Sequence, residues 1–442
     1  MRDSVISGAF YPQERRSLNT LMDKLFAASR GFVSVRKGAF AAFLPHAGYA
    51  YSGNLAAATL SCLEVGEAQI AVIVGTSHTA EGTAFSVYPK GSWITPLGEV
   101  SVAESFTSYL VKNSQYFQAD TEAHQHEHSV EVQIPMLQYL NPRIQIVPIA
   151  VRGAVPIAYE RMGQEIADAI HACGKKCILL ASGDMTHYEP LEQAEAKDQL
   201  AIEAMLKMDI QLLNDVVDEK KISMCGVAPA SIVISAARAL GARNARLVGY
   251  STSADSGADR TSVVGYAGLV FTNYRQHPLA DLAEKAVWAY VLRGEHLRTI
   301  PPHPEMKKSG AVFVSIKRGV HLRGCIGSIL PQFSTIGEEI VANAIAAASR
   351  DPRFPPVSPD ELPQLDFSVD VLSTPILVKS LVELDPRTFG IIVESGSRRG
   401  LLLPDLDGVD SVERQIEICR QKGGIGSKDA IDIYRFTVER YK

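Results

Sequence analysis

Three apolar runs in the first half of the chain each end in a short loop that carries a histidine. These are the run 39–44 before His46, the run 70–75 before His78 and the run 177–181 before His187. Neutral imidazole is a preferred ligand of iron, copper and zinc, and it also transfers protons near neutral pH. The three histidines therefore indicate a metal site or an acid–base site, provided that the fold brings the loops together.

Cysteine supplies a fourth candidate ligand. Cys225 stands just before an apolar helical pattern that begins at Val227, and a helix N-terminus lowers the pKa of a thiol and favours the thiolate that a metal needs. Taken singly, each residue has an equally good structural explanation, because loop histidines are often held by local hydrogen bonds and single cysteines often pack in the core. Cys173 and Cys177 are also spaced as a metal pair could be. A predicted helix end and a predicted strand start favour a structural role for both.

The elements that must position these residues follow an alternating pattern. Apolar strands alternate with helical periodicity as far as about residue 271, which predicts an α/β domain with a mostly parallel sheet flanked by helices. Ligands of such sheets bind beyond the carboxyl ends of the strands, where the histidine loops would lie. A polar break at 272–278 precedes shorter strands and interspersed helices, typical of a smaller α+β domain. We expect one domain over 1–272 and a second over 278–442.

Composition limits the classes of partner. The chain has 442 residues, 46% of them hydrophobic, which is enough for more than one core. The net charge is −5, and the chain has no long basic block. We therefore expect that the protein binds neither nucleic acid nor an anionic membrane surface. No apolar segment approaches the roughly 18 residues that cross a bilayer, and the N-terminus lacks the apolar part of a signal peptide. Six sparse cysteines fit a reducing compartment, so we expect a cytoplasmic protein, with a homo-oligomer left open.

Five segments of the chain resemble those of the Memo family in their order and in their local sequence. The segments are Pro45-His46-Ala47-Gly48-Tyr49, Gly75-Thr76-Ser77-His78, Glu127-His128-Ser129-Val130-Glu131, Ser182-Gly183-Asp184-Met185-Thr186-His187 and Cys225-Gly226. The resemblance implies a fold similar to class III extradiol dioxygenases. It also implies a metal held by His46, His78 and Cys225, with His187 in the position of the catalytic base.

Further residues join the candidate site with a less direct role. The segments that resemble the family include Glu127 and His128. We expect these two residues to line the pocket, to take part in catalysis or to contact the metal ligands from outside. Asp184 could orient His46 or His78, or it could cap the following turn. Tyr49 could line the pocket, although an aromatic residue beside a turn is commonly a packing residue.

The two other histidines of this region receive a structural interpretation. His124 and His128 have helical spacing and could form a second ligand pair on one helix face. A histidine-rich helix opening on a polar face is mostly solvated, so we expect His124 and His126 to face solvent.

The ligand set implied by the resemblance has a definite chemistry. Two imidazoles and one anion on iron(II) leave open positions for a chelating catechol or enediol and for oxygen. His187, with Asp184 and His128 nearby, would take up and return protons. We therefore expect a non-haem iron enzyme that cleaves a C–C bond or performs a related redox step on a small molecule. A soft thiolate ligand also admits copper or zinc, and two alternatives are a non-catalytic metal-binding or redox-regulatory scaffold and a zinc hydrolase.

The second domain carries a separate motif, Leu322-Arg323-Gly324-Cys325-Ile326-Gly327-Ser328. From the residues alone, this is a β-bulge with a buried thiol or a reactive thiolate stabilised by Arg323. Together with Ser349-Arg350-Asp351-Pro352-Arg353-Phe354-Pro355-Pro356, the motif resembles the AMMECR-type domain. The resemblance implies a fold and a cleft, in which we expect Arg323, Cys325, Asp351 and Arg353, with Cys325 as the candidate reactive group.

The two resemblances together suggest a partner. Memo-like and AMMECR-like proteins accompany a radical-SAM protein in the AmmeMemoRadiSam system, and this chain resembles a fusion of its proteins B and A. The chain lacks the CxxxCxxC triplet of a radical-SAM cluster. A radical-SAM protein is therefore the partner that we expect.

Overall fold

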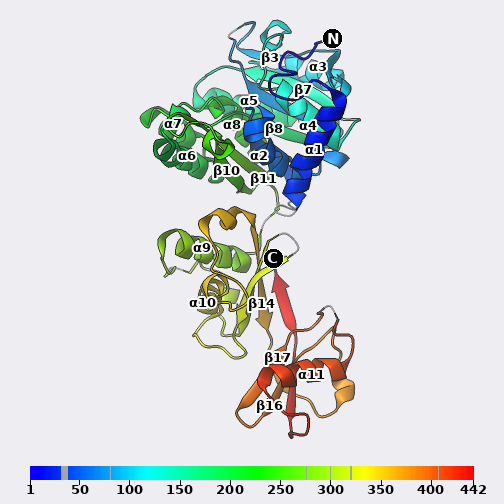
Figure 1. Cartoon of the computed structure of the whole chain (residues 1–442), viewed down its shortest axis with the longest axis vertical. Helices are drawn as coiled ribbons and strands as arrows, with labels where there is room; N and C mark the ends of the chain where they lie inside the picture. The colour runs from blue at the N-terminus through cyan, green and yellow to red at the C-terminus, as the bar shows by residue number, and fades with distance from the viewer. Residues whose placement is uncertain (31–37, 80, 275, 299, 319–320, 407) are drawn as a thin grey trace. The chain divides into compact units, whose positions relative to one another are not determined.

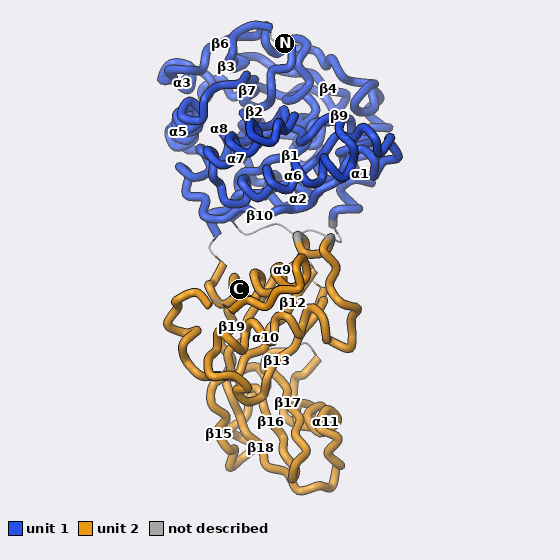
Figure 2. Tube along the Cα trace, turned by 90° about the vertical axis from the view of Figure 1, so that its left-hand side faces the viewer, with its two compact units in different colours: residues 1–275 blue, residues 276–442 orange. Residues whose placement is uncertain are grey.

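The computed structural model describes residues 1–30, 38–79, 81–274, 276–298, 300–318, 321–406 and 408–442. The chain divides into two compact units, residues 1–275 and 276–442 (Figure 2). The division falls within the polar break predicted at 272–278, of which residue 275 lies outside the described residues. Among the described helices, none is both long enough and apolar enough to span a bilayer.

Unit 1 is built on a nine-stranded sheet (Figure 1). In spatial order its strands are β10 (Asn244–Thr252), β11 (Val263–Thr272), β1 (Ala39–Leu44), β8 (Cys177–Ser182), β2 (Ile70–Thr76), β7 (Gln145–Val151), β3 (Phe85–Val87) and β6 (Gln118–Ala119), with β9 (His187–Glu189) paired to β11. The central strands β1, β8, β2 and β7 are parallel, whereas β11 and β3 pair antiparallel with β1 and β7. The predicted mostly parallel sheet is confirmed.

Helices cover both faces of this sheet. One core contains residues of α1 (Arg15–Arg30), α2 (Tyr49–Ser61) and α4 (Ile134–Leu140). The other contains residues of α3 (Glu104–Asn113), α5 (Pro156–Cys173), α6 (Leu191–Leu206), α7 (Ile210–Glu219) and α8 (Val227–Ala239). Burial on both faces explains why the central strands are continuous apolar runs rather than alternating ones. The hairpin of β4 (Ser92–Thr95) and β5 (Gly98–Ser101) forms a separate two-stranded sheet.

The register of the central strands sets the position of the site. Leu44 at the end of β1 pairs with Ser182 at the end of β8, and Ser182 also pairs with Gly75 near the end of β2. The three strands therefore finish side by side at one edge of the sheet. His46 and His78 follow within three residues of that edge.

Unit 2 is a smaller α+β unit, as predicted (Figure 1). One antiparallel sheet has the order β13 (His321–Gly327), β12 (Val312–Arg318), β14 (Leu365–Leu372) and β19 (Val438–Tyr441), and it packs with α9 (Pro278–Arg293) and α10 (Ile336–Ser349). The other has the order β15 (Ile376–Leu377), β18 (Asp432–Phe436), β16 (Gly390–Ser395) and β17 (Arg398–Leu402), and it packs with α11 (Val412–Gly423).

Candidate metal centre

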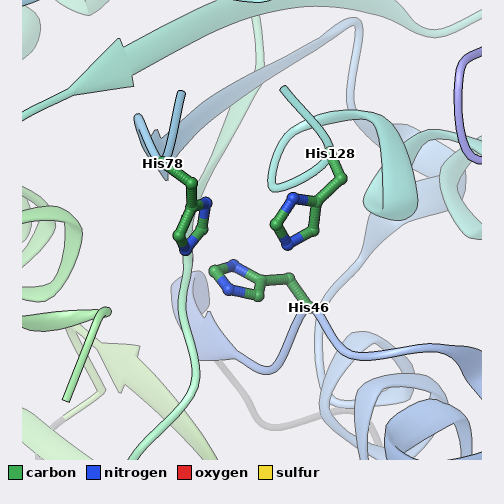
Figure 3. Close-up of side chains that lie close together, drawn as sticks. All are labelled: His46, His78 and His128. Atoms are coloured by element: carbon green, nitrogen blue, oxygen red, sulfur yellow. The ribbon is translucent and has the colours of Figure 1, made fainter. Parts of the chain in front are cut away.

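Three histidine rings meet at the carboxyl edge of the parallel strands. One ring nitrogen from each of His46, His78 and His128 lies within 4.8 Å of the others (Figure 3). His46 follows β1, His78 follows β2, and His128 comes from the loop before the short helix η3 (Glu131–Gln133). His46 is buried, whereas the side chain of His78 is 33% exposed. The group can therefore bind an ion and still be reached from solvent.

Glu127 fixes two of these rings. Its Oε1 accepts a hydrogen bond from His78 Nδ1 at 3.0 Å and lies 3.3 Å from His128 Nδ1. Because a carboxylate only accepts, His78 carries its proton on Nδ1 and keeps the Nε2 lone pair for an ion. Burial alone would raise the pKa of Glu127, but the hydrogen bonds that it accepts from the ring and the backbone N–H of His78 help to lower it to about 2. Glu127 is thus an ionised group that orients the His78 ring and lies beside the His128 ring.

His46 is the buried member of the group. Its Nδ1 is enclosed and has no hydrogen-bond partner in the described part of the chain. Burial, followed by the neighbouring His128 and His78, lowers the pKa of His46 well below its usual value. Burial also lowers the pKa of His128. Neutral imidazoles with an unused buried nitrogen match what a transition metal requires, so these residues fit a metal ion.

Cys225 and Asp184 lie on the other side of His46. Cys225 Sγ is 3.3 Å from His46 Nε2, and the Asp184 backbone N–H donates to that sulfur at 3.2 Å. The sulfur is thus beside the site but outside the group of three nitrogens. Burial, followed by the neighbouring Asp184 carboxylate, raises the pKa of the Cys225 thiol, which is the opposite direction to the lowering expected from the N-terminus of α8.

Asp184 supports His46 through the backbone. Its Oδ1 accepts from the backbone N–H of His46 at 2.8 Å, and its Oδ2 is 3.9 Å from His46 Nε2. Burial raises the pKa of Asp184 to about 7, although the His46 N–H opposes the rise. The close approach of the strands and α8 depends on glycine, because a Cβ on Gly183 would lie 2.2 Å from the Cα of Gly226.

His187 lies in β9, outside the three-nitrogen group. Its Nδ1 is 2.8 Å from the carbonyl oxygen of Ser223, and its backbone N–H donates to Ser223 Oγ at 2.8 Å. A carbonyl only accepts, so the proton is on Nδ1 and Nε2 can receive a proton. The neighbouring Tyr188 is 78% exposed and has φ 59°, a left-handed conformation that is rare for a residue with a side chain.

The loop that carries His128 is attached to the strand ends. Ser129 Oγ donates to the carbonyl of Thr76 at 2.8 Å, Ser182 Oγ donates to the carbonyl of Ser129 at 2.6 Å, and Gln133 Nε2 donates to Ser182 Oγ at 2.8 Å. Gly75 provides the space, since a Cβ there would lie 2.4 Å from Ser129 Oγ. These bonds hold His128 over the ends of β2 and β8.

A buried ion pair, absent from the sequence analysis, supports the same loop. Arg2 Nη1 is 2.6 Å from Glu131 Oε2, and Arg2 also donates to the carbonyls of His124 and Glu127. Glu131 accepts in addition from Tyr11 Oη at 2.8 Å. The N-terminal residues are thereby part of the site's framework. Their long separation along the chain left no local pattern from which to predict them.

The remaining residues of this region have structural surroundings. His124 is fully buried against the rings of Tyr88 and Trp93, so the expectation that it faces solvent is wrong. It ends the short helix η2 (Glu122–His124), and His128 lies beyond it in a loop, so the two do not share a helix face. His126 is exposed, as expected. Tyr49 is buried, and its hydroxyl donates to the carbonyl of Val132 at 2.6 Å.

The candidate residues of unit 2 form two ion-paired groups. Arg323 donates to both carboxylate oxygens of Glu361, at 2.7 and 2.8 Å, rather than to Cys325. Asp351 accepts from the backbone N–H of Cys325 at 2.8 Å and pairs with Arg353 at 2.7 Å. Cys325 Sγ accepts from Ser315 Oγ at 3.3 Å. The strand pairing shifts register opposite Arg323, which confirms the predicted bulge.

Two family models match the two units of the chain separately. Residues 2–270 match the family described as "Memo-like protein", and residues 280–441 match "AMMECR1". A "MEMO1 family protein" of Ignicoccus hospitalis is 36% identical over 280 residues, which is 61% of this chain and 98% of that protein. One from Archaeoglobus fulgidus is 38% identical over 271 residues, 61% of this chain and 99% of that protein. Among solved structures, an uncharacterized protein from Pyrococcus horikoshii is 31% identical, covers 37% of this chain and 88% of that chain, and has a TM-score of 0.34.

Proposed function

We propose, on the premise that this chain belongs to the Memo-like protein family through residues 2–270 and carries an AMMECR1 domain at residues 280–441, that unit 1 is a metal-dependent enzyme. The observation that carries the proposal is the buried, unpartnered Nδ1 of His46 in a group with His78 and His128. A buried imidazole nitrogen left without a partner is costly, and a bound ion removes that cost.

Iron(II) is the metal that we propose, with copper and zinc as competitors for the same imidazoles. His46, His78 and His128 would hold the ion, and Cys225 is a further candidate donor beside His46. A bound ferrous ion supplies open coordination positions for a chelating catechol or enediol and for oxygen. The proposed reaction is oxidative cleavage of a C–C bond, or a related redox step, on such a molecule.

The protein's own groups would position the substrate and move its protons. Glu127 keeps His78 in the tautomer whose Nε2 faces the ion. We place the substrate between the imidazole group and His187, whose Nε2 receives a hydroxyl proton as the substrate binds. Asp184 accepts a hydrogen bond from the backbone N–H of His46 and would hold that ligand in place beside the ion.

A second candidate function is supported by the ligand types. Three histidines are also the protein ligands of some catalytic zinc sites, in which the metal lowers the pKa of a bound water. A zinc hydrolase therefore competes with the iron enzyme, and a scaffold that binds metal without turnover is the non-catalytic alternative. Metal content and product identity separate the three.

The decisive experiment begins with protein purified without air. Its metal content is measured, and the iron-loaded protein is given a panel of catechols with oxygen while ring-opened products are followed by absorbance and mass spectrometry. His46→Ala, His78→Ala and His128→Ala should each lose metal, whereas His126→Ala, which alters an exposed histidine of the same loop, should keep it. Stoichiometric zinc with ester or amide turnover would favour the hydrolase. Bound iron with no product from any substrate would favour the scaffold.

We also propose a radical-SAM protein as the partner. The membership of both parts of the chain in these families supports the proposal, since the chain resembles a fusion of two components of the AmmeMemoRadiSam system. Co-expression with a radical-SAM protein of the proposed system, followed by anaerobic affinity purification and size-exclusion chromatography, tests the association. Separate elution of the two proteins at micromolar concentration would contradict it.

A further inference from the structure

Two cysteines meet at the opposite end of β8 from the metal centre. Cys173 is the last residue of α5 and Cys177 is the first residue of β8, and their sulfur atoms are 3.6 Å apart. Gly174, with φ 62°, makes the left-handed turn that reverses the chain between them. Asp184 follows the far end of the strand, seven residues from Cys177, a separation of roughly 20 Å along an extended chain. The pair is therefore distinct from the candidate metal centre.

The surroundings keep both sulfurs close and partly accessible. Both side chains are half-buried, and Gly174, Lys175 and Lys176 between them are exposed. Cys173 Sγ contacts the carbonyl of Ile170 at 3.1 Å, and Cys177 Sγ contacts the carbonyl of Lys175 at 3.4 Å. A disulfide requires a sulfur separation of about 2.05 Å, so closing the pair needs a movement of about 1.5 Å, which is within reach of side-chain rotation in a surface turn.

We infer that Cys173 and Cys177 form a redox site, oxidised reversibly to an intramolecular disulfide by a small-molecule disulfide such as glutathione disulfide. The inference concerns a modification site of unit 1 and is independent of the proposed metal chemistry. It depends on two thiols held together by the turn at Gly174, rather than on the reactivity of one.

The exchange proceeds in two steps. The thiol of Cys173 loses its proton, and the thiolate attacks one sulfur of the small disulfide; a mixed disulfide forms and one small thiolate leaves. Cys177 then loses its proton and attacks the sulfur of Cys173, which breaks the mixed disulfide and releases the second small thiolate. Two electrons pass from the protein to the small molecule, and the two protons end on its two thiols.

The order of attack follows from the environment of Cys177. Burial, followed by the neighbouring Cys173 sulfur, raises the pKa of the Cys177 thiol above its usual value. A raised pKa leaves less thiolate at neutral pH, which makes Cys177 the poorer initial nucleophile. Cys173 therefore opens the exchange and Cys177 resolves it.

Non-reducing peptide mapping tests the inference on the full chain. The protein is equilibrated with mixtures of reduced and oxidised glutathione, acid-quenched, alkylated and digested with trypsin. Because trypsin cuts after Lys175 and Lys176, the peptides 162–175 and 177–197 separate unless a disulfide joins them. We expect the joined pair to accumulate as the oxidised fraction rises, the number of free thiols to fall from six to four, and dithiothreitol to reverse both changes.

Single variants test the order of attack. Cys177→Ser should trap glutathione on Cys173, and Cys173→Ser should react at least about tenfold more slowly at Cys177. The peptide of Cys325, a half-buried thiol of unit 2, is the internal control and should not join another peptide. Unjoined peptides in wild-type protein at the most oxidising mixture, with native circular dichroism retained, would overturn the inference. Equal trapping in the two variants would overturn the assigned order.

Discussion

Glu127 accepts two hydrogen bonds from His78, one from the backbone N–H at 2.5 Å and one from ring Nδ1 at 3.0 Å. One carboxylate thus fixes both the position of the residue and the tautomer of its ring. The same carboxylate lies beside His128, so it couples two of the three imidazoles. Carboxylates that hydrogen-bond a metal-binding histidine typically have a large influence on metal affinity.

Replacement of Glu127 should therefore weaken metal binding. Glu127→Gln removes the charge that holds Nδ1–H of His78, and we expect metal affinity to fall by about 10- to 100-fold. Competition with a chromophoric chelator measures the change. Glu81→Gln, which alters an exposed pair with His126, is the matched control and should have no effect. Equal affinities of Glu127→Gln and wild type would show that the carboxylate does not orient a ligand.

The third metal ligand can be identified by a pair of variants. His128 contributes the third nitrogen of the group, whereas Cys225 lies beside His46 and was expected as a ligand from the family resemblance. We expect His128→Ala to lower metal content more than Cys225→Ser does. Metal analysis after anaerobic loading and desalting measures both. The reverse order would assign the ligand role to the sulfur.

His187 should separate catalysis from metal binding. Its ring lies outside the three-nitrogen group, and its Nδ1–H is held by Ser223. We expect His187→Gln to retain bound metal while turnover falls by about 100-fold or more, the usual contribution of a general base. Parallel metal analysis and product detection decide the matter. Loss of metal in this variant would place His187 among the ligands.

The buried ion pair between Arg2 and Glu131 should stabilise unit 1. Arg2→Ala leaves a buried carboxylate without its charged partner, and we expect a loss of about 3 kcal/mol in the free energy of unfolding. Urea unfolding followed by circular dichroism measures it. Lys176→Ala removes the exposed ion pairs with Glu64 and Glu67 and should cost less than about 1 kcal/mol. Similar losses in the two variants would contradict the assigned importance of burial.

The Arg323–Glu361 pair predicts acid sensitivity of unit 2. The hydrogen bond from Arg323 lowers the pKa of Glu361 from 4.5 to about 2, in spite of burial. A pKa that is lower in the folded state stabilises the fold above pH 4.5, and this stabilisation is lost as the pH falls from 4.5 through about 2. Glu361→Gln should therefore be less stable than wild type at pH 7, by up to about 3 kcal/mol, with the difference vanishing near pH 2. A constant difference over this range would contradict the assignment.

The alternation of apolar strands and helices was sufficient to predict the architecture. Strands buried on both faces are recognisable as continuous apolar runs, such as Ile70–Thr76, and parallel strands must place their carboxyl ends at one edge. The convergence of the loops that carry His46 and His78 follows from that topology alone. Local periodicity carries this information because each element is specified by its own residues.

The identity and environment of the site groups depended on long-range contacts. His128 reaches the group because Ser129 and Gln133 bind strand ends, and His124 is buried because it packs on Tyr88 and Trp93. Helical spacing suggested the opposite for His124, because that spacing assumes one helix that continues through His128, whereas η2 ends at His124. Loop conformation is set by side chains distant in the sequence, such as Glu131 and Arg2, and no local pattern contains those partners. The mostly parallel sheet with its covering helices could therefore be inferred from composition and period, whereas the order of its strands, the third imidazole and the position of Cys225 were known only from the tertiary structure.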